Sequence, residues 1–432
     1  MQTREHIYDA GLRAARPIIQ RLAGLHPKGD AAVRGRAEAE ARFAMWGERG
    51  RVAQSPVVLV HAPSVGEGLM AQAIIAELRS IRADVQIAFT FFSPSAERIA
   101  DRVGADVSGY LPIDTRPGMR ALVRTLRPDV VAFVRTEIWP MLGIEAQAAG
   151  AHVALVNAVL ASGSSRLGAG ARFLLGPAYR RLNAIGAVSA DDGARFDTFG
   201  VDRARVHVTG DARFDQVWTR VHAVDGANAF AYLRDHRPLL VAGSTWPADE
   251  DVLRDAIVRI PVEDRPRVVF APHEPTDTAL ASLEQKLDPL GGVTRLSALE
   301  RAGGGEADFI IIDRMGVLAD AYAAGDIAWV GGGFGDSGLH SIVEPAALGV
   351  PVLYGPRHGN AREAGELARA GGGFVVQDAY ALTAQLRRLT ADATARRLAG
   401  TAAVDFVRSR LGGGAANAAL LAGLIALHPR FR

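Results

Sequence analysis

The short turn Ser64-Val65-Gly66-Glu67 contains the residue with the clearest chemical potential in this sequence. It follows an apolar, β-branched stretch and precedes a helical pattern. The carboxylate of Glu67 should therefore project at the carboxyl edge of a sheet, where open α/β sheets bind ligands. There it could act as a general base and take a proton from an attacking hydroxyl group. The alternative is structural, because a glutamate in a first helical turn also complements the helix dipole.

A second turn, Gly331-Gly332-Gly333-Phe334-Gly335, follows another apolar stretch late in the chain. Residues 333–338 spell G-x-G-x-x-G, but the next expected strand, 351–354, ends without the acid that holds a ribose hydroxyl in a dinucleotide site. We therefore do not expect a nicotinamide cofactor. The glycines would still let a ligand phosphate approach backbone N–H groups at the start of a helix near His340.

Two further strand ends carry polar groups. Glu137 follows the stretch 129–134, and Arg213 lies in the segment 209–215 that closes the first half of the chain. A carboxylate and a guanidinium at one sheet edge could stabilise a polar transition state. Singly, each residue type is more often a helix cap or a surface ion-pair partner.

Composition argues against metal and thiol chemistry. The chain has no cysteine, which excludes disulfides, thiolate zinc sites and cysteine nucleophiles. His340 and Glu344 have the i, i+4 spacing of ligands on one helix face, but no H-E-x-x-H motif or third ligand accompanies them. We expect no metal and no other cofactor. The net charge is only +2, and among 49 basic residues only Lys28 and Lys286 are lysine. We do not interpret this arginine bias as nucleic-acid binding, although arginine suits phosphate recognition.

Strand and helix patterns alternate along the chain, which is typical of parallel sheets with crossover helices. We expect helices at residues 67–82 and 116–126 and loops at residues 303–305 and 412–414. Two series of strands are predicted, which indicates two doubly wound α/β domains. The first series is 57–62, 85–90, 107–112, 129–134, 152–157, 184–188 and 205–209, and the second is 238–242, 267–271, 308–312, 326–330, 351–354 and 373–376.

The N-terminal segment has the pattern of a basic amphipathic helix that is interrupted at Pro17. Such a helix can lie on an anionic bilayer surface or pack on the adjacent domain with its basic face in solvent, and both alternatives stay open. No stretch approaches the roughly 20 apolar residues of a membrane span, and the N-terminus lacks the apolar core of a signal peptide. We expect a protein that stays inside the cell.

Several ordered motifs together resemble the 3-deoxy-D-manno-octulosonic acid (Kdo) transferases. The similarity covers the chain after Arg42 and is carried by Trp46-Gly47-Glu48-Arg49, His61 to Glu67, Thr136-Glu137-Ile138-Trp139-Pro140, Asn157-Ala158, Gly210 to Asp215, Gly243-Ser244-Thr245-Trp246, Ala271-Pro272-His273-Glu274, and Glu344 to Gly349 with Pro351. The resemblance implies a GT-B fold, in which two domains face a central cleft. It also implies inverting transfer of Kdo from CMP-Kdo to the lipid A precursor of lipopolysaccharide.

The resemblance also implies roles for individual residues. Glu67 would accept the proton of the acceptor hydroxyl, and Glu137 and Arg213 would stabilise the transition state. The implied substrate-binding residues are Ser64, Gly66, Pro272, His273, Met315, Gly316, Val317, Gly333, His340, Ser341 and Glu344, of which Pro272, His273, the 315–317 turn and the 341–344 segment would contact CMP. The sequence departs from the family pattern at Arg213, Val317 and Ser341, where the family usually has lysine, an acid and asparagine.

The chain is predicted to have five segments, and the resemblance implies which ligand each of the two domains binds. The segments are a basic arm (1–50), an acceptor-binding domain (51–215), a linker (216–237), a nucleotide-sugar-binding domain (238–405) and a C-terminal helix (406–432) that can cross back to the first domain. The implied partners are CMP-Kdo, the lipid A precursor and the cytoplasmic face of the inner membrane, bound peripherally, with no nucleic acid. A GT-B transferase or sugar-nucleotide epimerase with another donor, or a catalytically idle relative, would share this architecture.

Overall fold

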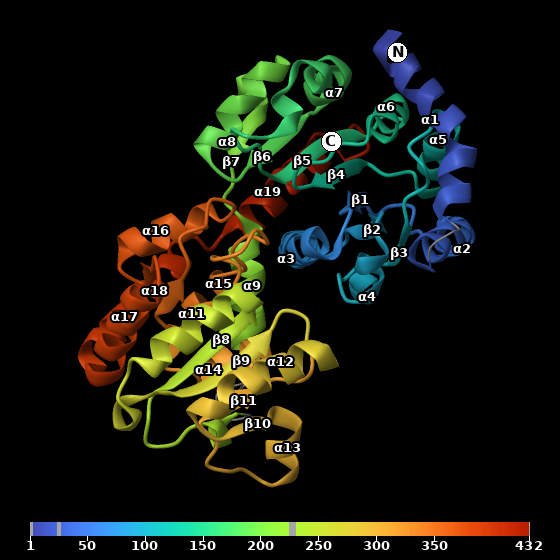
Figure 1. Ribbon diagram of the computed structural model, residues 1–432. Helices are drawn as coiled ribbons and strands as arrows, with labels where there is room; N and C mark the ends of the chain where they lie inside the picture. Colours follow the sequence, from blue (N-terminus) through green and yellow to red (C-terminus); the bar gives the residue numbers. More distant parts are fainter. Residues whose placement is uncertain (1–2, 24–26, 224–229, 432) are drawn as a thin grey trace. The chain divides into compact units, whose positions relative to one another are not determined.

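The computed structural model describes residues 3–23, 27–223 and 230–431 (Figure 1). The chain forms two compact units. Unit 1 contains residues 1–216 and 411–432, and unit 2 contains residues 217–410. The division falls inside helix α9 (Ala212–His222), so the start of the predicted linker at residues 216–222 is helical.

Unit 1 is built on a seven-stranded parallel sheet with the order β3-β2-β1-β4-β5-β6-β7. Strands β1 to β5 are almost entirely buried, as expected for parallel strands that are covered on both faces. All seven strands coincide with predicted ones to within two residues. They are β1 (Val57–His61), β2 (Gln86–Phe91), β3 (Val107–Tyr110), β4 (Val130–Val134), β5 (His152–Ala158), β6 (Ala184–Ala187) and β7 (Val206–Val208).

Most helices of unit 1 connect successive strands, and helices cover the sheet. Helix α19 packs on α3 and on β4, β5 and β6, whereas α2 packs on α5 and β3. The helices are α1 (Thr3–Ala23), α2 (Pro27–Arg49), α3 (Val65–Ile81), α4 (Glu97–Ala100), α5 (Arg116–Leu126), α6 (Pro140–Ala148), α7 (Ala169–Arg181), α8 (Ala190–Arg195) and α19 (Gly413–Leu427), with α9 at the boundary.

Helix α1 differs from its prediction. It continues through Pro17, so the expected interruption is wrong. A proline inside a helix costs about 3 kcal/mol, and packing of α1 against α2, α6 and α7 offsets this cost. The face of α1 that packs on the rest of unit 1 carries acidic side chains, since Glu5 and Asp9 are buried while Ile7 is exposed. Helix α1 thus packs on unit 1, and its binding to a membrane surface stays a prediction.

Unit 2 repeats the same architecture with the order β10-β11-β9-β8-β12-β13-β14. Its core surrounds the fully buried Trp329. The strands are β8 (Leu239–Thr245), β9 (Arg267–Pro272), β10 (Val293–Arg295), β11 (Phe309–Ile311), β12 (Ile327–Val330), β13 (Val352–Tyr354) and β14 (Gly373–Val375). The helices are α11 (Pro247–Val258), α12 (Asp277–Leu287), α13 (Leu296–Arg301), α14 (Leu318–Ala324), α15 (Val343–Ala347), α16 (Arg362–Ala370), α17 (Ala379–Ala391) and α18 (Ala393–Arg408).

The C-terminal residues return to unit 1. Gly412 has φ +100 and marks the turn, but Gly413 and Gly414 belong to α19 rather than to the predicted loop. Among the described residues, the stretch Ala393–Leu427 is long and apolar enough to span a membrane. It comprises α18 and α19 with a turn at residues 409–412 between them. Since core helices pass the same test, this is weak evidence for a span.

Candidate active site

The turn at Glu67 has the geometry expected of a reactive carboxylate at a sheet edge. Ser64 is the N-cap of α3, and its hydroxyl makes no bond to the helix N–H groups. Instead, Ser64 Oγ donates to Glu67 Oε2. The side chain of Glu67 is half-buried, so the carboxylate is held in place and remains accessible.

The rings of His61, Trp139 and Phe92 form a chain of contacts next to this turn. The ring of His61 is fully buried, and its Nδ1 lies 3.1 Å from Thr90 Oγ1. Burial lowers the pKa of His61 to about 3, so the ring is neutral at physiological pH and has a structural role. Its edge meets Trp139 with 5.2 Å between ring centroids, and Trp139 in turn contacts Phe92 at 5.0 Å.

A side-chain network joins the helix that carries Glu67 to three strand ends. Met70 Sδ, one turn after Glu67, lies 3.3 Å from Arg135 Nη1 and 3.1 Å from Asn157 Nδ2. Asn157 Nδ2 also donates to Asp211 Oδ1 (3.2 Å), and Asn157 Oδ1 accepts from the amide of Ala212 (2.8 Å). Arg135 and Asn157 have φ of +88 and +52. Such backbone strain in non-glycine residues is concentrated at functional sites.

Arg213 is positioned by this network. Its amide donates to Asp211 Oδ1 at 2.9 Å, and its Nη2 lies 3.6 Å from Asp211 Oδ2. Asn417 on α19 closes the network, because its Oδ1 accepts from the amide of Asn157 (2.9 Å) and from Thr209 Oγ1 (3.1 Å). Sequence reasoning missed Asn417 and Met70, and no local motif marks either residue.

Glu137 lies at the same sheet edge, in the segment after β4. Its side chain is 46% exposed and lies 3.4 Å from Arg166 Nη2. The backbone before it is fixed, since Tyr179 donates its hydroxyl hydrogen to the carbonyl of Thr136 (3.0 Å). In unit 1 the structure thus brings Glu67, Glu137 and Arg213 to one edge, with Arg166 as an additional cation.

In unit 2, three rings gather where β8 and β9 end. Trp246 and His273 stack with 4.7 Å between centroids, and His273 and His340 lie 4.4 Å apart. Trp246 Nε1 donates to His340 Nε2 at 3.1 Å. Burial and the neighbouring His273 lower the pKa of His340, so a neutral ring that accepts the indole hydrogen is favoured. The arrangement offers flat surfaces and ring nitrogens to a ligand.

His340 does not lie on a helix, contrary to the prediction. Helix α15 begins at Val343, because a helix that started at His340 would place the ring of Pro345 against the carbonyl of Ser341. The i, i+4 pairing of His340 with Glu344 is therefore wrong. Among residues 3–23, 27–223 and 230–431, no group of three or more His, Asp or Glu side chains is arranged to hold a metal ion.

The glycine-rich turn is shaped by backbone packing. A Cβ on Gly331 would lie 2.2 Å from the carbonyl oxygen of Ser244, and one on Gly333 would lie 2.6 Å from the amide of Gly355. Asp249, fully buried, accepts from the amides of Gly332 (2.8 Å) and Trp246 (3.0 Å). The expected helix does not follow directly, since residues 331–342 form an irregular segment. Close backbone packing is therefore sufficient to explain Gly331 and Gly333, whereas a Cβ on Gly335 would lie 3.9 Å from its nearest neighbour, the amide of Ser337.

A small cavity of about 240 Å³ lies beside Gly316 and Glu344. Arg220 and Glu344 form an ion pair on its wall, and Asp320 lines it as well. Other predicted ligand contacts of unit 2 differ in exposure. Met315 and Ser341 are exposed, Val317 is half-buried, and Pro272 is buried at the end of β9.

Comparisons with known proteins give a consistent result. Residues 38–216 match the family model of 3-deoxy-D-manno-octulosonic-acid transferase (kdotransferase). The chain is 30% identical over 354 residues to the 3-deoxy-D-manno-octulosonic acid transferase of Bordetella pertussis, covering 77% of this chain and 79% of the relative. It is 28% identical over 310 residues to the enzyme of the same name from Chlamydia trachomatis serovar A, covering 70% of each chain.

Solved structures with the same fold include a UDP-GlcNAc 2-epimerase from Neisseria meningitidis, with a TM-score of 0.59 at 14% identity over 86% of this chain and 99% of that chain. A glycosyltransferase from Rickettsia africae has a TM-score of 0.57 at 11% identity over 86% and 98%. These similarities and the two seven-stranded sheets confirm the predicted GT-B fold class. The placement of the two units around a cleft stays a prediction.

Proposed function

Because this chain belongs to the 3-deoxy-D-manno-octulosonic acid transferase family and is therefore a glycosyltransferase, we propose that it transfers Kdo from CMP-Kdo to a lipid A precursor in lipopolysaccharide synthesis. The transfer inverts the anomeric centre. Since the acceptor is a membrane lipid, the enzyme works peripherally at the cytoplasmic face of the inner membrane.

The observation that carries this proposal is the placement of Glu67. Its carboxylate is accessible, is held by Ser64 and stands at the carboxyl edge of the unit 1 sheet. In the proposed reaction, Glu67 takes the proton of an acceptor hydroxyl as the hydroxyl oxygen attacks the anomeric carbon of Kdo. The bond from that carbon to the CMP phosphate oxygen breaks, and CMP leaves with the electron pair. A single displacement inverts the centre.

Glu137 and Arg213 stabilise the transition state in this proposal. Arg213 is oriented by Asp211 and by the network that includes Met70, one turn from Glu67. Its cation can oppose negative charge that develops on the leaving phosphate or on the Kdo carboxylate. A guanidinium also binds such groups in a bidentate manner, which a lysine cannot do. Ser64 and Gly66 border the acceptor hydroxyl.

Unit 2 binds the donor nucleotide in this proposal. The stacked rings of Trp246, His273 and His340 present donors and flat surfaces near the end of β9. The cavity beside Gly316 and Glu344 accommodates part of CMP. The other contacts are those implied by the family resemblance, namely Pro272, Met315, Val317, Gly333 and Ser341.

A transfer assay tests this function directly. The full chain is incubated with CMP-Kdo generated in situ and tetraacylated lipid A precursor, and the product is weighed by mass spectrometry. We expect a product that is heavier by one or more Kdo residues, and far slower formation of it with Glu67→Gln. Competition by CMP but not by UDP separates this function from a transferase or epimerase with a uridine donor. CMP binding without any product would contradict the proposed acceptor.

A further inference from the structure

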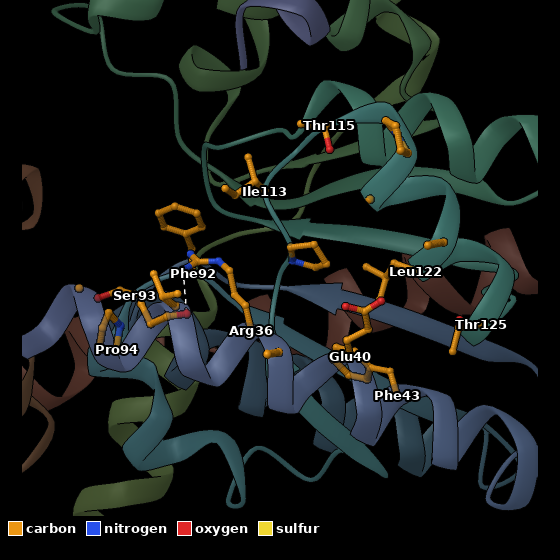
Figure 2. A pocket seen from close by; sticks show the side chains of 18 residues that line it. Arg36, Glu40, Phe43, Phe92, Ser93, Pro94, Ile113, Thr115, Leu122 and Thr125 are labelled. Carbon is orange, nitrogen blue, oxygen red and sulfur yellow. Dashed lines mark hydrogen bonds between the residues drawn. The ribbon is translucent and has the colours of Figure 1, made fainter. Parts of the chain in front are cut away.

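A large cavity in unit 1 lies between helices α2 and α5 (Figure 2). Its volume is about 810 Å³, which falls in the range of about 300–1,000 Å³ that is usual for small-molecule sites. Its remaining walls come from the segments that follow β2, at Phe92 to Pro94, and β3, at Pro112 and Ile113. The cavity therefore sits at the carboxyl edge of the sheet.

The lining of this cavity is mainly apolar, and several of its side chains are small. Ala32 and Ala37 contribute from α2, and Gly118 and Ala121 contribute from α5. These short side chains leave the space between the two helices open. Among the described residues that line it, only Arg36 and Glu40 are charged. A sugar or nucleotide would lose its hydrogen bonds to water here with few replacements, so the lining favours a hydrocarbon.

Arg36 contributes to the wall largely through its aliphatic stem. Its Nε donates to the carbonyl of Leu111 (3.1 Å), and its Nη1 donates to the carbonyl of Ala32 (2.9 Å). The guanidinium also lies 4.6 Å from the centroid of the Phe92 ring, and Figure 2 shows the two side chains next to each other. Because these contacts already occupy the guanidinium, its methylene groups remain to line the cavity.

The cavity adjoins the turn that carries Glu67. The amides of Phe92 and Ser93, both in the cavity wall, donate to the carbonyl of Pro63 at 3.2 and 2.8 Å. Pro63 directly precedes Ser64, the N-cap of the helix of Glu67. The Phe92 ring also contacts Trp139 at 5.0 Å, two residues after Glu137. An acceptor whose hydroxyl reaches Glu67 therefore has this cavity beside it.

We propose that the cavity receives one fatty acyl chain of the lipid acceptor. The inference rests on the proposed function and names how its substrate is recognised. A saturated chain is narrow, flexible and without polar groups, which matches a space between two helices that is lined mainly by apolar side chains. Occupation of the cavity by an acyl chain would hold the acceptor while its sugar hydroxyl meets Glu67.

Two filling variants and one matched control test this inference. Ala37→Phe and Ala121→Phe place a ring in the cavity from different helices, and both alanines are exposed, so folding should be unaffected. Ala41→Phe adds the same ring to α2 at an exposed position outside the cavity lining. Thermal melting of each variant checks the fold. Transfer is measured with the tetraacylated precursor and with its fully deacylated counterpart.

We expect both filling variants to raise KM for the acylated acceptor at least about ten-fold. Exclusion of two methylene groups of the acyl chain from the cavity lowers affinity by roughly that factor. KM for the deacylated acceptor should not change, and Ala41→Phe should resemble the natural protein with both acceptors. Equal KM values for natural and filled proteins would overturn the inference.

Direct binding of myristic acid by calorimetry separates this inference from the proposed function. The natural protein and Ala41→Phe should bind it, and the filling variants should bind at least about ten-fold more weakly. That result in a protein that transfers no Kdo would contradict the proposed reaction and leave the acyl site standing.

A sedimentation experiment with phosphatidylglycerol vesicles, without acceptor, tests binding to bilayer lipid. The same fraction of the natural protein and of every variant should sediment with the vesicles. If the filling variants alone lost vesicle binding with unchanged KM, the cavity would belong to bilayer lipid and the inference would fail.

Discussion

The carboxyl edges of the two sheets are built in different ways although both sheets are parallel and seven-stranded. At the edge of unit 1, polar side chains from distant segments bond to one another, with Asn157 in contact with Met70, Asp211 and Asn417. At the edge of unit 2, backbone segments pack directly, as at Gly331 and Ser244, and rings stack at Trp246 and His273. Unit 1 therefore orients charges, whereas unit 2 presents surfaces.

This difference matches the division of labour in a sugar transfer. Chemistry at a hydroxyl group needs a base and charges that are held in position. Recognition of a nucleotide needs close approach and flat contacts. If the comparison is right, changes at the unit 1 edge should alter turnover, and changes at the unit 2 edge should alter donor binding or stability.

The largest effect is expected from a pair of glutamate substitutions, one in each unit. Glu67→Gln removes the proposed base and should lower kcat by about 10²- to 10⁴-fold while CMP binding is unchanged. Glu344→Gln weakens the ion pair with Arg220 in unit 2 and should mainly raise KM for CMP-Kdo. Steady-state kinetics with calorimetry of CMP binding separates the two, and a kcat loss in Glu344→Gln alone would reverse the assignment.

Glycine substitutions should also have opposite outcomes in the two units. In Gly331→Ala the new Cβ meets the carbonyl oxygen of Ser244 at 2.2 Å, so we expect destabilisation of about 3 kcal/mol or more. In Gly66→Ala the nearest atom is Ser64 Oγ at 3.9 Å, and the helical position should gain about 0.4–1 kcal/mol. Urea unfolding of both proteins gives the two values. A stable Gly331→Ala protein would show that the segment is not fixed by packing.

Each unit contains a buried aspartate at a helix start, and Asp114 in unit 1 should make stability depend on pH. It accepts from the amides of Met141 and Leu142 at 3.1 and 2.9 Å, and burial raises its pKa from 3.8 to about 6. Between these values the folded protein binds more protons than the unfolded chain, so the free energy of unfolding decreases as pH rises through this window.

Asp114→Asn should remove this dependence. Between pH 4 and pH 7 the free energy of unfolding of the variant, relative to that of the natural protein, should rise by about 3 kcal/mol, since one pKa unit corresponds to about 1.36 kcal/mol. Urea titrations at several pH values measure it. Asp249→Asn is the corresponding variant in unit 2, because burial also raises the pKa of Asp249. A parallel pair of pH curves for natural protein and Asp114→Asn would contradict the assignment.

A smaller effect is expected at Asn417. Asn417→Ala leaves the amide of Asn157 and the hydroxyl of Thr209 without their shared acceptor, which should cost about 1–3 kcal/mol. Because the network orients Arg213, kcat should also fall while CMP binding is retained. Asn417→Asp keeps the acceptor oxygen but loses the hydrogen bond that Nδ2 donates to the carbonyl of Gly413 (2.8 Å) and buries a charge, so it should not recover the stability. Full activity of the alanine variant would separate this network from the chemistry.

Much of the fold was predictable because parallel strands with both faces covered are continuous apolar runs. Strand β10 was missed, since its three residues, Val293 to Arg295, are short and only half-buried. The helix expected at His340 was wrong because proline geometry at Pro345 outweighs the spacing of the neighbouring residues. Of the three glycines in the G-x-G-x-x-G pattern, Gly333 is required by close backbone packing and Gly338 has a positive φ, and sequence alone cannot distinguish such needs from phosphate binding.

The candidate site was predictable where a motif is local and not where a partner is distant. Glu67 and Ser64 are neighbours in one turn, so their pattern was informative, although their roles stay predictions. Asn157 and Asn417 are separated by 260 residues, and only the fold brings them together. The packing of α2 against α5, which forms the acyl cavity, likewise has no local signal.

The return of helix α19 to unit 1 has a consequence for how the protein is made. Asn157 leaves the ribosome 260 residues before Asn417, a delay on the order of 10–50 s at about 5–20 residues per second. Throughout that interval the groove on α3, β4, β5 and β6 that α19 fills is uncovered, and the whole of unit 2 is synthesised in the meantime. Nascent unit 1 is therefore a natural client for chaperones that shield apolar surface until translation ends.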